Sequence, residues 1–353
     1  MSIDKIKYGI GLFLMAFVFV SCEKEEEKND NPQLAVLEAQ KDIVASVEYM
    51  GICYGPYHHD GQAPGTAISK SQIETDLGMI AKHFDFLRTY TVADGMEQVV
   101  PVAASKGLEV ALGVHCYPND AAATKADIDK AVQQAKAHPA TILALVIGNE
   151  TNLHGPNHVP PATVADYMKY AKQKLDEQGL EEPVTSCITG VGADHINSYG
   201  DQDYCGPILQ QCKDLNKPDH RVVLLTIYPY YGNGQPNEIG GNMQWSYNHG
   251  MSNAENNFGL GVIIGEIGWP TGASNNGTQT ARENIAYCET NFKTSLDWVN
   301  GNNFMNQAYN SFWFEIFDEP WKTQEPNGIG PSWGIYAKNG AQTPKFPIPD
   351  LRR

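Results

Sequence analysis

The chain has 353 residues, of which 41 are acidic and 25 basic, so its formal net charge at pH 7 is −16. This balance argues against a nucleic-acid-binding protein, which needs a basic face. It suits a protein that acts on a neutral or cationic ligand, and the length is more than enough for one large hydrophobic core.

The N-terminus predicts export and not a part of the fold. Lys5 and Lys7 precede an apolar run at 8–20, which is too short for a typical membrane-spanning helix and ends close to Cys22. A cysteine directly after such a run resembles the lipobox of bacterial lipoproteins. We therefore expect 1–21 to be a signal peptide and Cys22 to be the acylated first residue. The alternative is a plain signal peptide followed by an incidental cysteine.

The segment 22–43 contains a charged run that cannot bury apolar surface, so we expect it to be a disordered tether. An acidic run at this place resembles the surface-export signal of Bacteroidetes lipoproteins. The predicted location is therefore the outer membrane, with the protein exposed on the cell surface and held by its lipid alone. A periplasm-facing lipoprotein is the alternative.

From residue 44 to 353 short apolar strands alternate with amphipathic helices. Eight such units predict a parallel sheet closed into a single-domain (β/α)8 barrel. Asp94 is expected to cap the second helix, and Gly107 to end it. The expected strands are 49–55, 86–90, 108–117, 141–150, 183–188, 221–228, 262–266 and 308–317. The expected helices are 71–84, 94–106, 124–138, 162–178 and 278–300, with a further one near 205–212.

The cysteines and histidines indicate no metal site, and we expect no cofactor. Three cysteines fall on expected strands, where cysteine behaves as a small buried hydrophobe; they are Cys53, Cys116 and Cys187. Cys205 and Cys212 could form a local disulfide in an oxidising compartment. No cysteine spacing resembles a zinc site, and the pair at 58–59 is interpreted as a loop feature without acidic partners.

Two of the expected strands end in a glutamate. An apolar run leads through Gly265 to Glu266, and a second leads through Gly148 to Asn149 and Glu150. One such acid could belong to a solvated turn, but two at the same rim of a barrel would meet. Paired carboxylates are what glycoside cleavage needs: one protonates the leaving oxygen, and the other attacks the anomeric carbon or activates water.

Several stretches carry a resemblance to a known family. They are 51–57, 87–90, 112–114, 146–150, 227–230, 265–271 and 313–322. In this order the sequence resembles glycoside hydrolase family 17, the β-1,3-glucanase-like enzymes of clan A, over residues 50 to about 340. The resemblance implies a β-glucan substrate and cleavage with retention of configuration.

The resemblance also implies roles for individual residues. Glu150 would be the acid/base and Glu266 the nucleophile, with their carboxyl groups about 5–5.5 Å apart. Asn149 would hydrogen-bond the sugar 2-OH. Tyr228 would donate a hydrogen bond to Glu266 and keep it ionised, with Lys322 as a second candidate for this role. The alternative for Tyr228 is an ordinary aromatic residue at the barrel mouth.

Other residues are expected at the substrate site. Glu319 and Lys322 match a family Glu-x-x-Lys that binds sugar or tunes the nucleophile, whereas a surface salt bridge is the alternative. Thr226 stands where many relatives have Asn, which puts one hydrogen bond of the site in question, and Glu325 is left unassigned. Several aromatic residues are candidates for stacking on sugar rings: Tyr54, Tyr57, Tyr90, Tyr117, Tyr230, Trp269, Trp313 and Trp321. Some of them must belong to the core, and Trp313 is the first candidate for a core position.

Three functions compete. The preferred one is hydrolysis of β-1,3-glucan by a monomer, with endo action favoured. A β-1,3-glucanosyltransferase would use the same covalent intermediate but pass the glycosyl group to a sugar hydroxyl. A non-catalytic glycan-binding lipoprotein would be expected to lack a catalytic acid, and both Glu150 and Glu266 are present.

Overall fold

The computed structural model describes residues 49–195, 200–232, 239–273 and 282–353. The predicted signal peptide, lipidated Cys22 and tether lie outside these residues and stay predictions. Within the described ranges no helix combines the length and the apolar character needed to cross a membrane.

Eight parallel strands form a closed barrel, in which each strand pairs with the next along the chain and β8 pairs with β1. The predicted (β/α)8 fold is therefore confirmed, with strand boundaries that differ from the expected ones by a few residues. The strands are β1 (Met50–Cys53), β2 (Phe86–Arg88), β3 (Glu109–Val114), β4 (Ile142–Asn149), β5 (Val184–Thr189), β6 (Val222–Thr226), β7 (Gly261–Gly268) and β8 (Ser311–Phe314).

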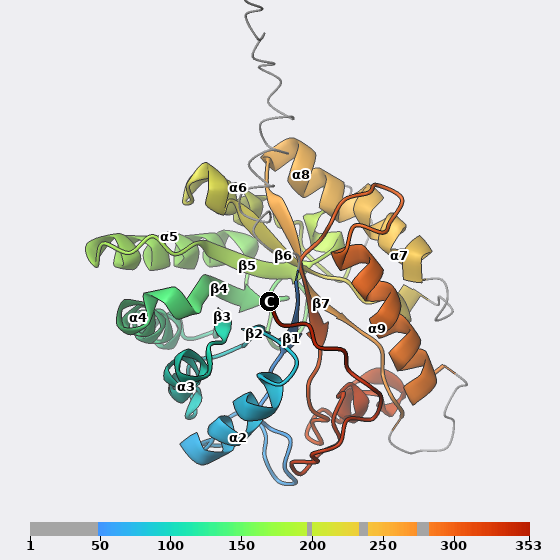
Figure 1. The fold of residues 1–353 in the computed structure, drawn as a ribbon. Helices are drawn as coiled ribbons and strands as arrows, with labels where there is room; N and C mark the ends of the chain where they lie inside the picture. The colour runs from blue at the N-terminus through green and yellow to red at the C-terminus, as the bar shows by residue number, and fades with distance from the viewer. Residues whose placement is uncertain (1–48, 196–199, 233–238, 274–281) are drawn as a thin grey trace, which may run out of the picture.

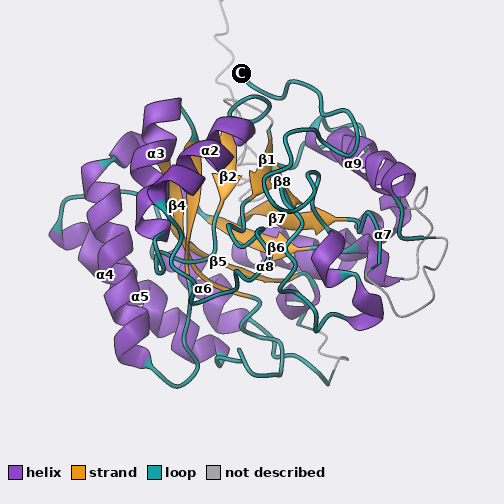
Figure 2. Ribbon diagram, turned by 90° about the horizontal axis from the view of Figure 1, so that it is seen from below, coloured by secondary structure: helices purple, strands orange, loops and turns teal. Residues whose placement is uncertain are grey.

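Helices surround the barrel, as the view down its axis shows (Figure 1), and the view from the side shows them flanking the strands (Figure 2). They are α2 (Lys70–Ile80), α3 (Val99–Lys106), α4 (Ala121–Ala137), α5 (Pro161–Glu177), α6 (Gly206–Asp214), α7 (Ile239–Ser246), α8 (Ser252–Phe258) and α9 (Ile285–Val299). The sequence did not predict α7 and α8. The reason is clear in α8, which buries Asn253 and Ala254 in place of a row of large apolar side chains.

Some helix ends follow local capping rules, and one prediction of a cap fails. The Ser69 side chain accepts from the Gln72 N–H at the start of α2, and Gly107 ends α3 with φ 72°, as predicted. The prediction that Asp94 caps a helix is wrong. Asp94 has φ 56° and its carboxylate accepts from the backbone of Gly65, while the helical segment begins with a 3-10 turn, Met96–Gln98.

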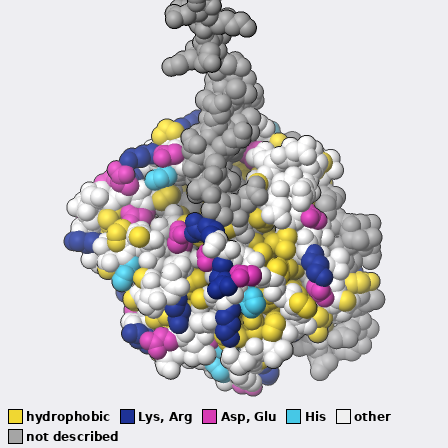
Figure 3. Space-filling model, in the orientation of Figure 1, with side chains coloured by type: hydrophobic (Ala, Val, Ile, Leu, Met, Phe, Trp, Pro, Cys, Tyr) yellow, Lys and Arg dark blue, Asp and Glu magenta, His cyan; other side chains and the backbone are white. Residues whose placement is uncertain are grey.

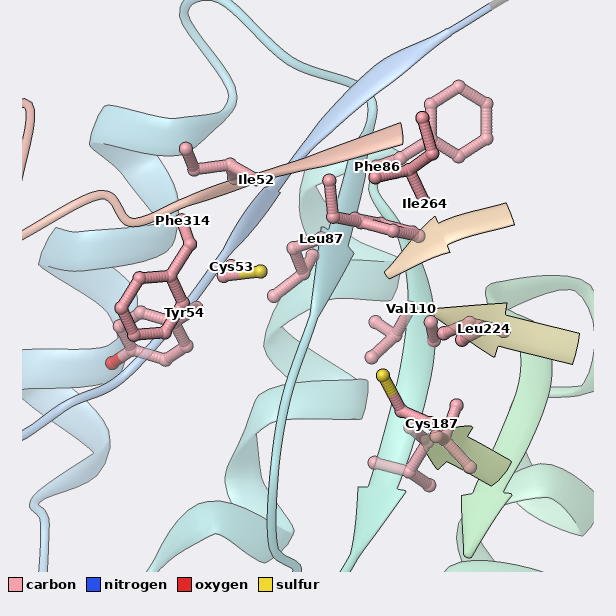
Figure 4. Close-up of a cluster of buried hydrophobic side chains, with 14 of the residues drawn as sticks. Ile52, Cys53, Tyr54, Phe86, Leu87, Val110, Cys187, Leu224, Ile264 and Phe314 are labelled. Atoms are coloured by element: carbon pink, nitrogen blue, oxygen red, sulfur yellow. The ribbon is translucent and has the colours of Figure 1, made fainter. Parts of the chain in front are cut away.

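The strands contribute to one hydrophobic core, and six of its buried side chains, from six different strands, are labelled in Figure 4. They are Cys53, Leu87, Val110, Cys187, Leu224 and Ile264. The strand cysteines are buried, as expected. Cys205 and Cys212 are free thiols with separate neighbours, so the suggested disulfide is absent.

The C-terminus closes the end of the barrel at which the strands begin. The backbone N–H of Arg353 donates to Asp85, and its guanidinium pairs with Glu109, the first residue of β3. The C-terminus lies over the centre of the ring in Figure 1, and the same face carries basic and acidic side chains close to one another in Figure 3. The strand-end glutamates therefore lie at the opposite end, which the C-terminal segment leaves uncovered.

Candidate active site

The two strands that carry the predicted catalytic pair are both irregular just before the glutamate. On β7, Glu266 pairs with Thr226 of β6 after one extra residue, so two residues of β7 oppose one of β6. On β4, three residues advance to Asn149 while β5 advances two to Cys187. Such bulges re-aim a side chain at the edge of a sheet. The same device therefore turns each carboxylate out of the regular alternation.

Glu150 leaves β4 in an unusual backbone conformation. Gly148 has φ 78°, which glycine adopts freely, but Glu150 itself has φ 48°. Its backbone N–H donates to the Cys187 carbonyl at 2.9 Å, which ties the strained residue to β5. Left-handed conformations of non-glycine residues persist where the surrounding structure holds them, and they cluster at functional sites.

Glu266 is 3% exposed, and both of its carboxylate oxygens are held. Oε1 accepts from Arg88 Nη1 at 2.7 Å, and Oε2 accepts from the Tyr228 hydroxyl at 2.5 Å. Arg88 ends β2 and is fully buried. A buried carboxylate with a cation on one oxygen and a hydroxyl donor on the other is stabilised in its ionised form. The predicted hydrogen bond from Tyr228 is present.

Arg88 is one of the residues of this site to which the sequence gave no role. It lies in one of the family-like stretches, and an arginine at the end of an apolar strand was the only available signal. Lys322, which was expected to help hold Glu266, instead pairs with Glu315 and Glu319. That part of the prediction is wrong, because the cation that faces the predicted nucleophile comes from β2 and not from the segment after β8.

Arg88 also fixes Asn149. Its Nη2 donates to Asn149 Oδ1 at 2.5 Å. A guanidinium has only donors, so the amide oxygen must face it, and the Asn149 NH₂ group is left to donate elsewhere. Arg88 therefore links the strand-end residues of β4 and β7, and the predicted contact of Asn149 with a sugar hydroxyl stays a prediction.

Glu150 has different neighbours from Glu266. The Thr226 hydroxyl donates to its Oε1, and within the described part of the chain no basic side chain forms an ion pair with it. Removal from water, followed by the negative charge of Glu266, raises the pKa of Glu150 to about 7, although Thr226 and Arg88 oppose this shift. A substantial fraction of Glu150 is thus protonated near neutral pH. Thr226, the departure from the family pattern, contacts the predicted acid directly.

The segment after β8 forms a buried network of its own. Lys322 Nζ lies 2.8 and 2.9 Å from the two oxygens of Glu315 and 2.6 Å from Glu319 Oε2. The other oxygen of Glu319 accepts from the backbone N–H of Tyr57. Burial raises the pKa of Glu315 well above its usual value, whereas Lys322 overcomes the same effect at Glu319 and lowers its pKa. The alternative of a surface salt bridge is wrong, because all three side chains are largely buried.

The predicted aromatic residues fall into two groups. Tyr54 and Trp269 are fully buried: the Tyr54 hydroxyl donates to Asp76, and Trp269 Nε1 donates to the Arg282 carbonyl. Their predicted contact with sugar is wrong, because neither ring has an exposed face. Trp313 is core, as expected, and Tyr57 and Tyr230 are nearly buried. Tyr90, Tyr117 and Trp321 keep partly exposed side chains.

A further aromatic group surrounds Tyr228. Its ring lies 5.3 Å from that of Trp333 and 5.8 Å from that of Phe314. Trp333 Nε1 donates to Glu325, and the Tyr231 ring, 51% exposed, lies 5.9 Å from Tyr228. Sequence reasoning did not assign Tyr231, Trp333 or Glu325. They meet only because the segment after β8 folds back toward the end of β6.

His58 also differs from its interpretation as a loop feature. It is fully buried, its Nε2 lies 3.0 Å from Asp76 Oδ2, and its ring stacks on Phe317. Asp76 belongs to α2 and accepts from Tyr54 as well. The acidic partner that the sequence did not reveal therefore lies on the helix that follows β1.

Comparison with known proteins identifies the family of the chain. Residues 51–334 match the family model described as the BtgE/BtgC glycoside hydrolase domain. The chain belongs to this family. It is therefore a glycoside hydrolase, and the predicted enzyme class is confirmed.

Individual relatives are more distant. The chain is 26% identical over 317 residues to a protein of Arthroderma benhamiae named "Glucan 1,3-beta-glucosidase", covering 84% of this chain and 89% of the relative. It is 24% identical over 304 residues to the "Probable glucan endo-1,3-beta-glucosidase btgC" of Aspergillus fumigatus, covering 80% of this chain but 40% of that protein.

The fold has a counterpart among solved structures. The glycoside hydrolase family 17 β-1,3-glucanosyltransferase from Rhizomucor miehei superposes with a TM-score of 0.61 at 15% identity. The match covers 86% of this chain and 98% of that structure. At this identity the likeness establishes the shared fold.

Proposed function

We propose that the protein is a retaining glycoside hydrolase that cleaves β-1,3-glucan by double displacement. The observation that carries the proposal is that the two strand-end glutamates lie in different electrostatic environments. Glu266 accepts hydrogen bonds from the Arg88 guanidinium and the Tyr228 hydroxyl, one on each oxygen, while the pKa of Glu150 is raised to about 7. A retaining mechanism needs one carboxylate as nucleophile and one carboxylic acid as proton donor.

In this mechanism Glu266 attacks the anomeric carbon while Glu150 gives its proton to the departing glycosidic oxygen. The bond to the leaving sugar breaks, and a covalent glycosyl–Glu266 intermediate forms. Glu150, now ionised, then takes a proton from water as the water attacks the same carbon and releases Glu266. The NH₂ group of Asn149, oriented by Arg88, would donate to the sugar 2-OH next to the reacting carbon.

The proposed substrate class is inferred from the names of the relatives. The relatives reported above are named for action on 1,3-β-glucan, and this chain belongs to the BtgE/BtgC glycoside hydrolase domain family. A product time course on laminarin, with curdlan, mixed-linkage glucan and cellulose as comparisons, tests it. We expect laminarin and curdlan to be cleaved, with a spread of oligosaccharides appearing early if action is endo. Cleavage of cellulose with laminarin untouched would contradict the proposal.

A glucanosyltransferase is the second candidate, favoured by the likeness to the Rhizomucor miehei enzyme. It requires the same intermediate, but a sugar hydroxyl takes the place of water. Incubation with a single laminari-oligosaccharide separates the two activities. Products longer than the starting sugar would indicate transfer, whereas shorter products alone indicate hydrolysis.

The cellular location is proposed from the sequence. Lys5 and Lys7, the apolar run that follows and Cys22 support acylation at Cys22 and a lipid-anchored protein of the outer membrane, exposed on the cell surface. Cys22→Ala should release the protein from the membrane fraction with its glucanase activity intact. Protease treatment of intact cells then separates surface exposure from a periplasm-facing anchor. A Cys22→Ala protein that still sediments with membranes would refute acylation as the anchor.

A further inference from the structure

Two histidines and an aspartate gather at the barrel rim, on residues that the proposed reaction does not use. His154 and His158 lie in the loop after β4, and Asp203 lies in the segment before α6. His154 Nε2 is 2.9 Å from Asp203 Oδ1, and His158 Nε2 is 2.8 Å from Asp203 Oδ2. The ligand-type atoms all lie within 4.8 Å of one another. We propose that these three residues bind a divalent transition-metal ion of the zinc class.

The donor set selects the class of ion. Two imidazole nitrogens and one carboxylate oxygen suit Zn²⁺ and its transition-metal neighbours, whereas Ca²⁺ and Mg²⁺ prefer oxygen ligands throughout. Three protein ligands leave a fourth position for water. The side chains of His154, His158 and Asp203 are 47%, 29% and 35% exposed, so an ion can reach them from solution.

The present geometry needs only a small adjustment. Zinc bonds of about 2.0–2.1 Å in a tetrahedral site place ligand atoms about 3.3 Å apart. The two histidines contact different oxygens of Asp203, at 2.9 and 2.8 Å, so coordination through one oxygen would require the carboxylate to turn and the imidazoles to move toward one another. Without an ion, each Nε2–H donates to Asp203. With one, Nε2 presents its lone pair to the ion, and the ring carries its proton on Nδ1.

The backbone that carries the three residues is already fixed. Leu153 and Gln202 form an antiparallel bridge between the two loops. The His154 N–H donates to the Asp201 carbonyl at 2.8 Å, and the Asp203 N–H donates to the Asn152 carbonyl at 2.9 Å. Ordering of ligands is a large part of the free-energy cost of a metal site, so a frame held by these bonds favours binding.

The site would clamp two loops of the rim together. The loop that holds His154 and His158 begins at Glu150, whose carbonyl accepts from the Leu153 N–H at 3.1 Å. Within the described ranges the three ligands form no hydrogen bond or ion pair with the Glu150 or Glu266 carboxylates, so the ion would have a structural role and the reaction does not require it as a reactant. Binding to the folded state alone should raise the unfolding temperature.

Titration of the chelator-treated full-length protein with ZnCl₂ tests the proposal, with Co²⁺ absorption in the visible range as a second readout of nitrogen and oxygen ligation. We expect one saturable equivalent in the wild type. His158→Ala and Asp203→Asn should bind Zn²⁺ at least about 10–100-fold more weakly. Loss of a residue that only hydrogen-bonds a metal ligand already weakens binding by this factor, so loss of a ligand should cost at least as much. His220→Ala is the matched control, since His220 lies 3.9 Å from a single aspartate, Asp219, and should bind as the wild type does.

Thermal unfolding guards against variants that fail to fold. His154→Ala should disturb folding least of the three ligand substitutions, because the His154 side chain is nearly half exposed. Zn²⁺ should raise the unfolding temperature of the wild type and of His220→Ala, but not that of His154→Ala. Absence of a saturable equivalent in the wild type would overturn the proposal. So would equal zinc affinity in folded His154→Ala, because the cluster would then be a hydrogen-bonded His–Asp–His group only.

Discussion

Glu150 and Glu266 occupy matching places in the molecule, and their surroundings make them chemically different. Each follows a bulge at the end of a buried strand. Glu266 has a cation, Arg88, on one oxygen and the Tyr228 hydroxyl on the other. Glu150 has the Thr226 hydroxyl and no ion-pair partner among the described residues. The role of each carboxylate is therefore set by its partners and not by its motif.

Arg88 interacts differently with the two glutamates. Arg88 pairs directly with Glu266 and only opposes, at a distance, the rise in the pKa of Glu150. The charge that Arg88 stabilises on Glu266 in turn raises the pKa of Glu150. One buried arginine on β2 thus supports the proposed nucleophile and, through the charge on that carboxylate, the proposed proton donor. Substitution of the residues that contact Glu150 and Glu266 should therefore change activity in a predictable way.

The largest effect is expected from removing either carboxylate. Glu266→Ala should lower turnover of laminarin by at least about 10⁴-fold, as loss of a nucleophile does. With a substrate that carries an activated leaving group, azide should rescue Glu266→Ala to the α-glycosyl azide, because it enters from the face that Glu266 vacates. Glu150→Ala should give the β-azide. A β-azide from Glu266→Ala would reverse the assignment of the two roles.

Next in size is the loss of Arg88. Arg88→Met leaves Glu266 buried without its cation and Asn149 without its orienting donor, so we expect kcat to fall by about 10²–10³-fold. Breaking a buried ion pair should also lower the free energy of unfolding by about 3–5 kcal/mol. Arg353→Met is the control: its ion pairs are partly exposed, and its loss should change stability by less than about 1 kcal/mol. Equal effects of the two variants would refute a special role for Arg88.

A smaller effect is expected at Tyr228. Tyr228→Phe removes the hydroxyl that donates to Glu266 Oε2 but keeps the ring that packs on Trp333. The rate should fall by about 10–10³-fold, within the range for a positioned hydrogen bond, with little change in unfolding temperature. Tyr170→Phe loses only a surface hydrogen bond to Asp129 and should keep nearly full activity. Wild-type kcat in Tyr228→Phe would show that the hydroxyl is dispensable.

The smallest effect concerns pH. Glu150 must be protonated in the first step, and its pKa is raised to about 7, so kcat/KM should fall as the pH rises through about 7. The Thr226 hydroxyl favours the ionised form of Glu150. Thr226→Val should therefore move this limb to higher pH, by less than about one pH unit, since one neutral hydrogen bond contributes roughly 1 kcal/mol.

A pH–rate series on wild type, Thr226→Val and Glu150→Gln measures this effect, with an activated leaving group for Glu150→Gln. The limb near pH 7 should be absent from Glu150→Gln. An unchanged limb in Glu150→Gln, or a shift to lower pH in Thr226→Val, would remove Glu150 as the proton donor.

The sequence by itself determined the barrel and the two glutamates. Strand and helix periodicity is local, so eight alternating units predict a closed parallel sheet without knowledge of any contact. Gly148 before Asn149 and Glu150, and Gly265 before Glu266, are local as well, and they place both acids at strand ends. The predicted hydrogen bond of Tyr228 was also found, because neighbouring strands β6 and β7 bring their ends together.

Only the tertiary structure decided which partners these residues take. Arg88 and Glu266 are 178 positions apart, and the buried ion pair between them forms because the barrel closes and a bulge on β7 turns the carboxylate inward. The direction of a ring is equally non-local: Tyr54 and Trp269 lie in family-like motifs, yet both point into the core. The local sequence pattern determines the position of a residue on its strand or helix. Burial, charge pairing and strand register across the whole barrel determine which residues its side chain contacts.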